Sequence, residues 1–173
     1  MLTIASLSKC EVSHAACSGV MDRNMWEQTR HKRSATRVFY NGLGSLTTGF
    51  MSKVAKDSRE QKLKVCQDHV TAPQSLAYFM YANWDKYSNF TDFQDIWKIG
   101  SQTAYVSTPE NNKLKEWTEK KTASVVYCSI VDRYKNSDIR LYKPNYGWTW
   151  EYPFDLPEGF LEFEAKVLLQ ERN

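Results

Sequence analysis

The stretch Lys64–Ser75, KVCQDHVTAPQS, puts Asp68 directly before His69 and a proline, Pro73, a few residues later. A histidine in this setting is either a reaction centre or part of a polar turn between two helices. Pro73 fits the first turn of a helix, because the N–H that proline lacks is not needed there. We therefore expect Asp68-His69 to form the turn between a charged helix over Leu46–Lys64 and a helix that starts near Pro73.

Helical periodicity continues on both sides of this stretch. It predicts a mostly helical stretch from Glu11 to about Val38, a helix in TDFQDIWKIG (91–100) with Thr91 as its cap, and an amphipathic helix in the C-terminal segment 156–172. Another is expected after Thr108 as N-cap and Pro109 as first residue. The positions expected in the core are Leu76, Phe79, Met80, Trp84, Phe93, Ile96, Trp97, Phe160, Leu161, Phe163, Val167 and Leu168.

Strand signals are concentrated in the last third of the chain. The segments 123–133, 139–144 and 147–152 are rich in β-branched and aromatic residues and are separated by turn sequences, which is typical of an antiparallel meander or hairpin. We predict an α+β fold, helix-rich, in a single domain with a small antiparallel sheet. A basic helical region over 1–45 is expected to join a core over 46–173 through a possible hinge at Gly42–Gly49.

Charge is distributed unevenly along the 173 residues. Residues 1–64 carry 11 Lys and Arg against 5 Asp and Glu, whereas residues 145–173 carry 2 against 6. A basic surface suits a polyanion such as nucleic acid, because neutralised phosphates release counterions. The alternative is a solvated helix face whose charges pair with the acidic tail. The aromatic content of 14% also allows two readings, base stacking or protein interfaces.

The chain shows no apolar run of about 18 residues and no signal-peptide pattern at its start, so we expect a mature chain without a membrane span. Four cysteines without a secretory signal favour free thiols and a cytoplasmic location, the host cytoplasm if a phage encodes the protein.

Cys10, His14 and Cys17 have helical spacing and could bind zinc with Cys66 or His31. A structural zinc is not expected, because known sites cluster as closely spaced cysteine pairs.

Basic residues next to aromatic ones are the predicted DNA contacts. In RHKRSATRVFYNG the basic side chains lie on a helix or just past its end, with Phe39 or Tyr40 stacking on a base or packing beneath it. A second group alternates with aromatics in the predicted strands, where a strand pair could enter the major groove. The predicted DNA-binding residues are Arg30, Lys32, Arg33, Arg37, Arg133, Lys135, Arg140 and Lys143.

The segments CQDHVTAP and TAYVSTPENNKLKEW together resemble the Asp-His…Asn pattern of phage-type HNH endonucleases, the His-Me-finger nucleases that include homing enzymes. In that family a D-H-x-x-P motif opens the site and an asparagine in a later V-T-x-E-N segment closes it. The resemblance covers Val65 to about Trp117. It differs from the compact ββα finger in that two predicted helices, Ser75 to Gly100, separate the motifs and zinc-knuckle cysteine pairs are absent.

The resemblance implies a metal-dependent DNA endonuclease acting on double-stranded DNA. His69 resembles the general base that activates water, Asp68 a ligand of Mg²⁺ or Mn²⁺, and Asn111 or Asn112 the second protein ligand. Two alternatives stay open. One is a non-catalytic nucleic-acid-binding or regulatory protein in which Asp68-His69 is only a hydrogen-bonded turn. The other is a protein–protein interaction module.

Overall fold

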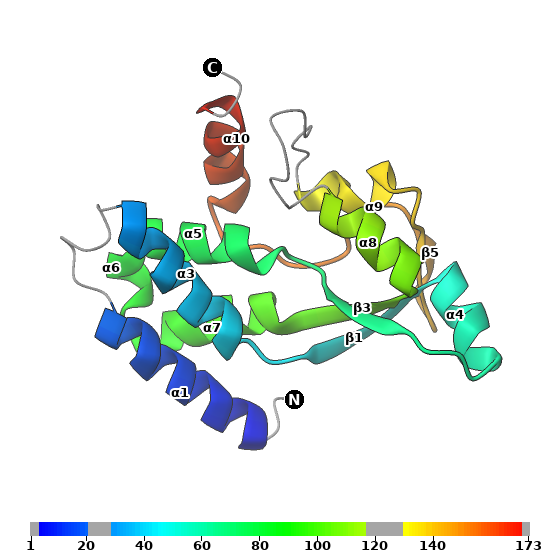
Figure 1. The fold of residues 1–173 in the computed structure, drawn as a ribbon, viewed down its shortest axis with the longest axis horizontal. Coiled ribbons are helices and arrows are strands. Elements are labelled where there is room, and N and C mark those ends of the chain that lie inside the picture. Colours follow the sequence, from blue (N-terminus) through cyan, green and yellow to red (C-terminus); the bar gives the residue numbers. More distant parts are fainter. Residues whose placement is uncertain (1–3, 21–28, 117–129, 171–173) are drawn as a thin grey trace. The chain divides into compact units, whose positions relative to one another are not determined.

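The structure is a computed structural model that describes residues 4–20, 29–116 and 130–170. Within these ranges the fold is α+β, with nine α-helices and a mixed sheet of five strands. The helices are α1 (Ile4–Val20), α3 (Thr29–Gly42), α4 (Lys53–Glu60), α5 (Pro73–Ala82), α6 (Trp84–Tyr87), α7 (Phe90–Ser101), α8 (Thr108–Glu116), α9 (Arg133–Asn136) and α10 (Phe160–Gln170), with a 3₁₀ turn η1 (Ile130–Asp132); the strands are β1 (Leu46–Ser52), β2 (Cys66–His69), β3 (Gln102–Val106), β4 (Leu141–Lys143) and β5 (Gly147–Thr149) (Figure 1). The predicted α+β class is confirmed.

The chain forms two compact units, each built from two separate segments. The first unit contains Met1–Leu46 and Thr71–Gln102, and the second contains Thr47–Val70 and Thr103–Asn173. The division predicted from the sequence was into 1–45 and 46–173. It differs from these units because Thr71–Gln102 belongs to the first unit. Among the described residues, no helix combines the length and apolar character needed to cross a bilayer.

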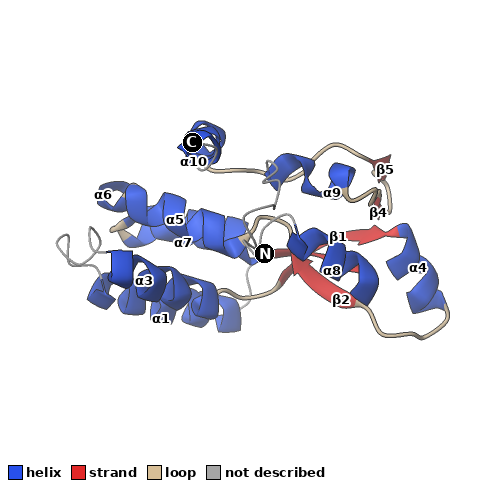
Figure 2. Cartoon of the chain, turned by 45° about the horizontal axis from the view of Figure 1, so that its top comes forward, coloured by secondary structure: helices blue, strands red, loops and turns tan. Residues whose placement is uncertain are grey.

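The first unit is helical. Helix α3 packs against α1 and α5, and α7 packs against α1, α5 and α6 (Figure 2). Pro73 is the first residue of α5, as predicted. Most of the predicted core positions of this unit are confirmed as buried: Leu76, Phe79, Met80, Phe93, Ile96 and Trp97. Trp84 instead begins the short helix α6 and is half-buried.

Two helix boundaries in this unit differ from the prediction. Helix α7 is capped by Asn89, whose Oδ1 accepts the Asp92 N–H at 3.0 Å, and Thr91 lies inside the first turn. An asparagine side chain can satisfy one of the amides that a helix start leaves open, and Asn89 does so before Thr91 is reached. The mostly helical stretch predicted from Glu11 to about Val38 corresponds to two helices, α1, which begins at Ile4, and α3, which ends at Gly42; residues 21–28 are outside the described ranges.

The sheet lies in the second unit, with its strands in the order β2-β3-β1-β4-β5. The pairs β2–β3, β1–β4 and β4–β5 are antiparallel. The neighbours β3 and β1 run in the same direction, which makes the sheet mixed (Figure 1). The purely antiparallel sheet that we expected is therefore wrong.

The helix predicted over Leu46–Lys64 is also wrong in its first part, because Leu46–Ser52 is strand β1. This segment contains two threonines and Phe50, residue types that favour the extended backbone of a sheet. Ser52 then ends the strand and caps α4, with its Oγ accepting the Ala55 N–H at 3.0 Å. The charged part of the segment forms α4, as the periodicity indicated.

Asp68-His69 does not form a turn. Both residues belong to β2, where Asp68 pairs with Ala104 and His69 with Thr103 of β3. The whole of β2 is paired with a strand that is distant in the sequence, so its extended conformation is stabilised by a contact that local pattern does not reveal.

The C-terminal strand predictions are confirmed only for the hairpin β4–β5, whose turn contains Asn145 with a φ of 67° and is followed by Gly147, the first residue of β5, with a φ of 87°. Of the predicted strand 123–133, residues 123–129 lie outside the described ranges, and the rest forms η1 and the start of α9. In α10, Phe160 is buried as predicted, Phe163 is half-buried, and Leu161 is exposed. The side chains of Val167 and Leu168 are not among those described.

The core of the second unit is formed by apolar side chains from the sheet and from α8 and α9. They are Phe50, Val70, Ala104, Val106, Leu114, Tyr134, Ile139 and Leu141, with Cys66 and Phe154 packed against them. Helix α8 enters this core through Leu114, which is fully buried. The sheet face that carries Ala104 and Val106 is therefore the face that α8 covers.

The starts of α4 and α8 are joined by a hydrogen bond. The N-cap of α8 is Ser107, one residue before the predicted Thr108: the Glu110 N–H lies 3.4 Å from Ser107 Oγ, and the Ser107 N–H donates to Glu110 Oε2 at 2.8 Å, which makes a capping box. The same Glu110 oxygen accepts the Ser52 hydroxyl at 2.6 Å. One carboxylate therefore supports the caps of two helices.

Because Glu110 serves both caps, we expect Glu110→Ala to lower the free energy of unfolding by about 1–2 kcal/mol. Ser52→Ala should cost a similar amount, and the double variant should cost less than the two losses added together, because the residues share one bond. Urea denaturation followed by circular dichroism measures these values. Glu116→Ala, at the exposed end of α8, is the control and should change stability by less than about 0.5 kcal/mol. Full additivity of Ser52→Ala and Glu110→Ala would contradict the coupling.

Candidate functional site

The side chains of Asp68 and His69 point to opposite faces of the sheet. Successive residues of a strand alternate between the two faces, and directly paired residues share a face. Asp68 therefore shares its face with Ala104, which lies in the core under α8. His69, half-buried, shares the other face with Thr103.

Asp68 is part of a buried polar triad with Arg133 and Tyr134. Arg133 Nη2 donates to Asp68 Oδ2 at 2.6 Å, and Nη1 lies 3.5 Å from Oδ1. The Tyr134 hydroxyl donates to Oδ2 at 2.7 Å. Arg133 Nη2 also donates to the carbonyl oxygen of His69 at 2.7 Å. Arg133 is 3% exposed and Asp68 is 8% exposed, so the pair is shielded from water.

The pKa shifts of Arg133 and Tyr134 agree with an ion pair between Arg133 and Asp68. Burial by itself lowers the pKa of Arg133, but the adjacent Asp68 carboxylate raises it, and the net direction is upward. Burial raises the pKa of Tyr134 well above its ordinary value, and the negative charge of Asp68 adds to that rise. Tyr134 therefore stays a hydrogen-bond donor and Arg133 stays charged, as an ion pair in the interior requires.

The predicted metal ligands and the predicted base do not converge. Asn111 and Asn112 lie in the first part of α8, which packs on the Asp68 face of the sheet, whereas His69 belongs to the other face. The start of α8 lies near the opposite end of β2 from His69, since Thr108 Oγ1 is 3.3 Å from Cys66 Sγ. A cation beside Asp68 would also have to displace Arg133. The strand–strand–helix order β2, β3, α8 is present, without the side-chain arrangement that the resemblance implies.

The possible zinc ligands have other contacts. His14 Nε2 lies 2.8 Å from the Ser88 carbonyl oxygen, and its ring packs edge-on against Phe90 and Phe93. Cys17 is buried and forms a side-chain hydrogen bond with Tyr81. Burial raises the pKa of its thiol to about 11. Over residues 4–20, 29–116 and 130–170, no three His, Cys, Asp or Glu side chains gather in a group that could hold a metal.

The predicted DNA-binding residues are distributed over both units. Arg30, Lys32, Arg33 and Arg37 lie in α3; Arg37 is exposed, and the other three side chains are not described. Lys135 is exposed on α9. The prediction that Arg133 contacts DNA is wrong, because its guanidinium is buried and donates to Asp68 in the core, where a phosphate cannot reach it. Lys143 is half-buried, with its ammonium 5.2 Å from the Phe50 ring centre.

Arg140 belongs to a continuous row of cations and rings that we call the aromatic–cationic ladder, formed by Lys56, Tyr142, Trp148, Arg140 and Trp150. The Lys56 ammonium lies 5.6 Å from the Tyr142 ring centre, and the Tyr142 and Trp148 ring centres are 4.9 Å apart. The Arg140 guanidinium lies 5.9 Å from the centres of both Trp148 and Trp150. Each step is within the range of cation–π or aromatic contact.

The ladder occupies the face of the β4–β5 hairpin that points away from the core. Tyr142 pairs with Trp148, whereas the neighbouring Leu141 is buried on the opposite face. Trp148 and Trp150 are 37% and 40% exposed, high values for tryptophan. Arg140 was predicted from the sequence as a DNA contact, but its contacts with these rings were not. The sequence does show the pattern, because Arg140 is two residues from Tyr142 and Trp148 is two residues from Trp150, in and next to the two strands.

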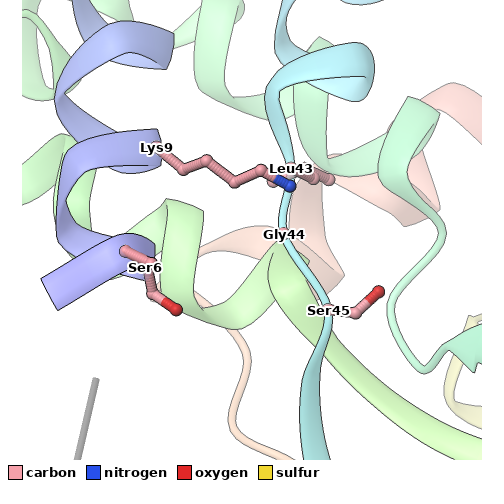
Figure 3. Close-up of a pocket in the computed structure, with 6 residues that line it drawn as sticks. Ser6, Lys9, Leu43, Gly44 and Ser45 are labelled. Carbon is pink, nitrogen blue, oxygen red and sulfur yellow. The ribbon is translucent and has the colours of Figure 1, made fainter. Parts of the chain in front are cut away.

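A separate open pocket of about 380 Å³ lies in the first unit. It is lined by Ala5, Ser6, Lys9, Leu43, Gly44 and Ser45. Lys9 extends from α1 toward Leu43 and Gly44 (Figure 3). Among these lining residues Lys9 alone carries a charge, so the pocket does not combine an acid with a base or a nucleophile.

The triad gives Asp68 a structural role that can be measured. We expect Asp68→Ala to lower the free energy of unfolding by about 3–5 kcal/mol, because it leaves the buried Arg133 charge without its partner. Asp95→Ala is the matched control: it breaks the exposed ion pair of Asp95 with Lys98, 2.8 Å long, and should cost less than about 1 kcal/mol. Chemical denaturation measures both. Equal losses for the two variants would contradict the role of Asp68.

Comparison of the chain with protein-family models, with curated proteins and with solved structures found no match. The assignment of function therefore depends on the contacts within this chain.

Proposed function

We propose that this protein is a non-catalytic nucleic-acid-binding protein whose contact surface is the aromatic–cationic ladder. The observation that carries the proposal is a row of three rings on the outer side of the β4–β5 hairpin, contacted by two cations: Arg140 of the hairpin and Lys56 of α4. Cations bind phosphates and ring faces stack on bases, so this pattern offers both kinds of contact that nucleic acids need.

The cations distinguish this surface from an ordinary protein interface. The buried centre of a protein–protein interface is depleted in lysine and other charged residues, although arginine and tryptophan are common there. In the ladder, Lys56 contacts Tyr142, and Arg140 contacts both tryptophans, so each of the three rings has a cation beside it. The exposed Glu60 lies 3.5 Å from the Lys56 ammonium, but such a surface pair is weak and leaves the lysine available to a phosphate.

The endonuclease implied by the HNH resemblance stays a prediction. The order of β2, β3 and α8 favours it, because His69 and the asparagines occur on the elements that the family uses. Two observations favour a non-catalytic protein. His69 and α8 lie on opposite faces of the sheet, and the charge of Asp68 is paired with that of Arg133. We therefore propose binding without hydrolysis as the function that the geometry supports best.

Binding through the ladder predicts a defined effect of removing one cation. We expect a fluorescently labelled mixed-sequence oligonucleotide to bind at low salt, with fluorescence anisotropy as the measurement. Arg140→Gln should weaken binding and make the slope of log K against log salt shallower by about 0.7–0.9, the contribution of one phosphate contact. Lys98→Gln, which removes a lysine of the first unit whose side chain is 38% exposed, is the charge-matched control and should leave both quantities unchanged.

The same measurement can overturn the proposal. Failure of the parent protein to bind at low salt would remove nucleic acid as the ligand. Equal weakening by Arg140→Gln and Lys98→Gln would reduce the effect to net charge and would remove the ladder as the contact surface.

The absence of catalysis is tested on supercoiled plasmid with Mg²⁺ and with Mn²⁺. We expect any nicking in the parent preparation to persist unchanged in His69→Ala, because His69 and the predicted ligands do not share a face of the sheet. Circular dichroism checks that the variant is folded. Nicking by the parent that is lost in folded His69→Ala would establish the endonuclease and contradict our reading.

A further inference from the structure

We infer that the ligand of the aromatic–cationic ladder is a single-stranded nucleic acid, with bases stacked on Trp148 and Trp150 and the backbone held by Lys56 and Arg140. This inference rests on the proposed function and specifies the class of nucleic acid. It depends on the direction and the exposure of the rings and on the contacts that they make.

The two tryptophans present their rings on the same side of the hairpin. Trp148 belongs to β5 and Trp150 is the first residue after it, and the Arg140 guanidinium lies over both rings, so the two rings are on the same side. The register of β4 with β5 pairs Tyr142 with Trp148, and Arg140, the residue before β4, contacts Trp150. All four side chains therefore belong to one surface, and the printed distances between them agree with this placement.

A duplex does not offer the faces of its bases to exposed rings. In a duplex the base faces are already covered by their neighbours, and side chains reach only base edges and phosphates. An extended single strand can separate its bases and place them on such rings, as sheet-based RNA-binding modules do.

Both tryptophan rings already make contacts within the chain before a ligand binds. Arg140 lies at the same distance, 5.9 Å, from both tryptophan centres, and Trp148 also contacts Tyr142 at 4.9 Å between centres. Rings that are already held in place lose little conformational freedom on binding. Because β5 is an edge strand of the sheet, a ligand can approach it without displacing another strand.

The small number of cations also favours a single strand. The ladder contains two, Lys56 and Arg140, so it can neutralise about two phosphates. For a single strand this gives a slope of log K against log salt of about −1.4. Binding would then depend mainly on stacking, which accepts any base, and should show little sequence preference.

The test compares three labelled ligands of equal length by fluorescence anisotropy: a mixed-sequence single-stranded DNA, its duplex, and a single strand in which every base is replaced by an abasic site. We expect the single strand to bind at least about ten times more tightly than either of the others. Trp148→Ala and Trp150→Ala should each weaken single-strand binding by about 5- to 100-fold, with little effect on the duplex. Trp148→Phe should retain most of the affinity, because it keeps a stacking ring.

Tyr146→Ala is the matched control. Tyr146 is in the same hairpin and is 58% exposed, but its ring contacts Phe50 on the core side, 5.2 Å between centres. It should leave single-strand binding unchanged. Thermal unfolding monitored by circular dichroism identifies any variant that is not folded, and the Phe and Ala variants at Trp148 can then be compared directly.

The outcomes separate this inference from the proposed function. Equal or tighter binding of the duplex, with no effect of the tryptophan variants, would overturn the single-strand inference and leave nucleic-acid binding intact. Equal binding of the abasic strand would overturn base stacking in the same way. Binding of none of the three ligands at low salt would overturn the proposed function itself.

Discussion

The second unit depends on one buried ion pair. Arg133 and Asp68 lie in the same core as Ala104, Val106 and Leu114, and a charge in such surroundings is tolerated only with its partner and its hydrogen bonds in place. Arg133 also binds the carbonyl oxygen of His69, so one guanidinium fixes both a side chain and the backbone of β2. The pair thereby sets which residue of the Asp68-His69 dipeptide points inward.

This constraint changes the meaning of the motif. A dipeptide of a carboxylate and an imidazole suggests shared chemistry when it is read in the sequence, but in a paired strand its two side chains are directed to opposite faces. On the buried face, Asp68 stabilises the core through its ion pair with Arg133. The side chains that can contact a ligand are the exposed ones on the outer face of the β4–β5 hairpin.

The sequence predicted the elements that local pattern determines and missed those that distant pairing determines. Pro73 and the apolar spacing of Leu76, Phe79 and Met80 identified α5, because helix periodicity and capping are local signals. Strands β1 and β2 were mistaken for helix and turn, since their stabilisation comes from β4 and β3. Arg140 could be selected as exposed and basic, but not Arg133, because only its pairing with Asp68, 65 residues away, shows that it is buried.

The shared bond of Ser52 and Glu110 has a consequence for the order in which the unit acquires structure. Helix α4 has 8 residues, too few to be stable in water by itself. The carboxylate that orients its capping hydroxyl comes from 58 residues further along the chain. The start of a local element is thus fixed by a contact of high sequence separation, so α4 should gain full order only as the loop to α8 closes during folding.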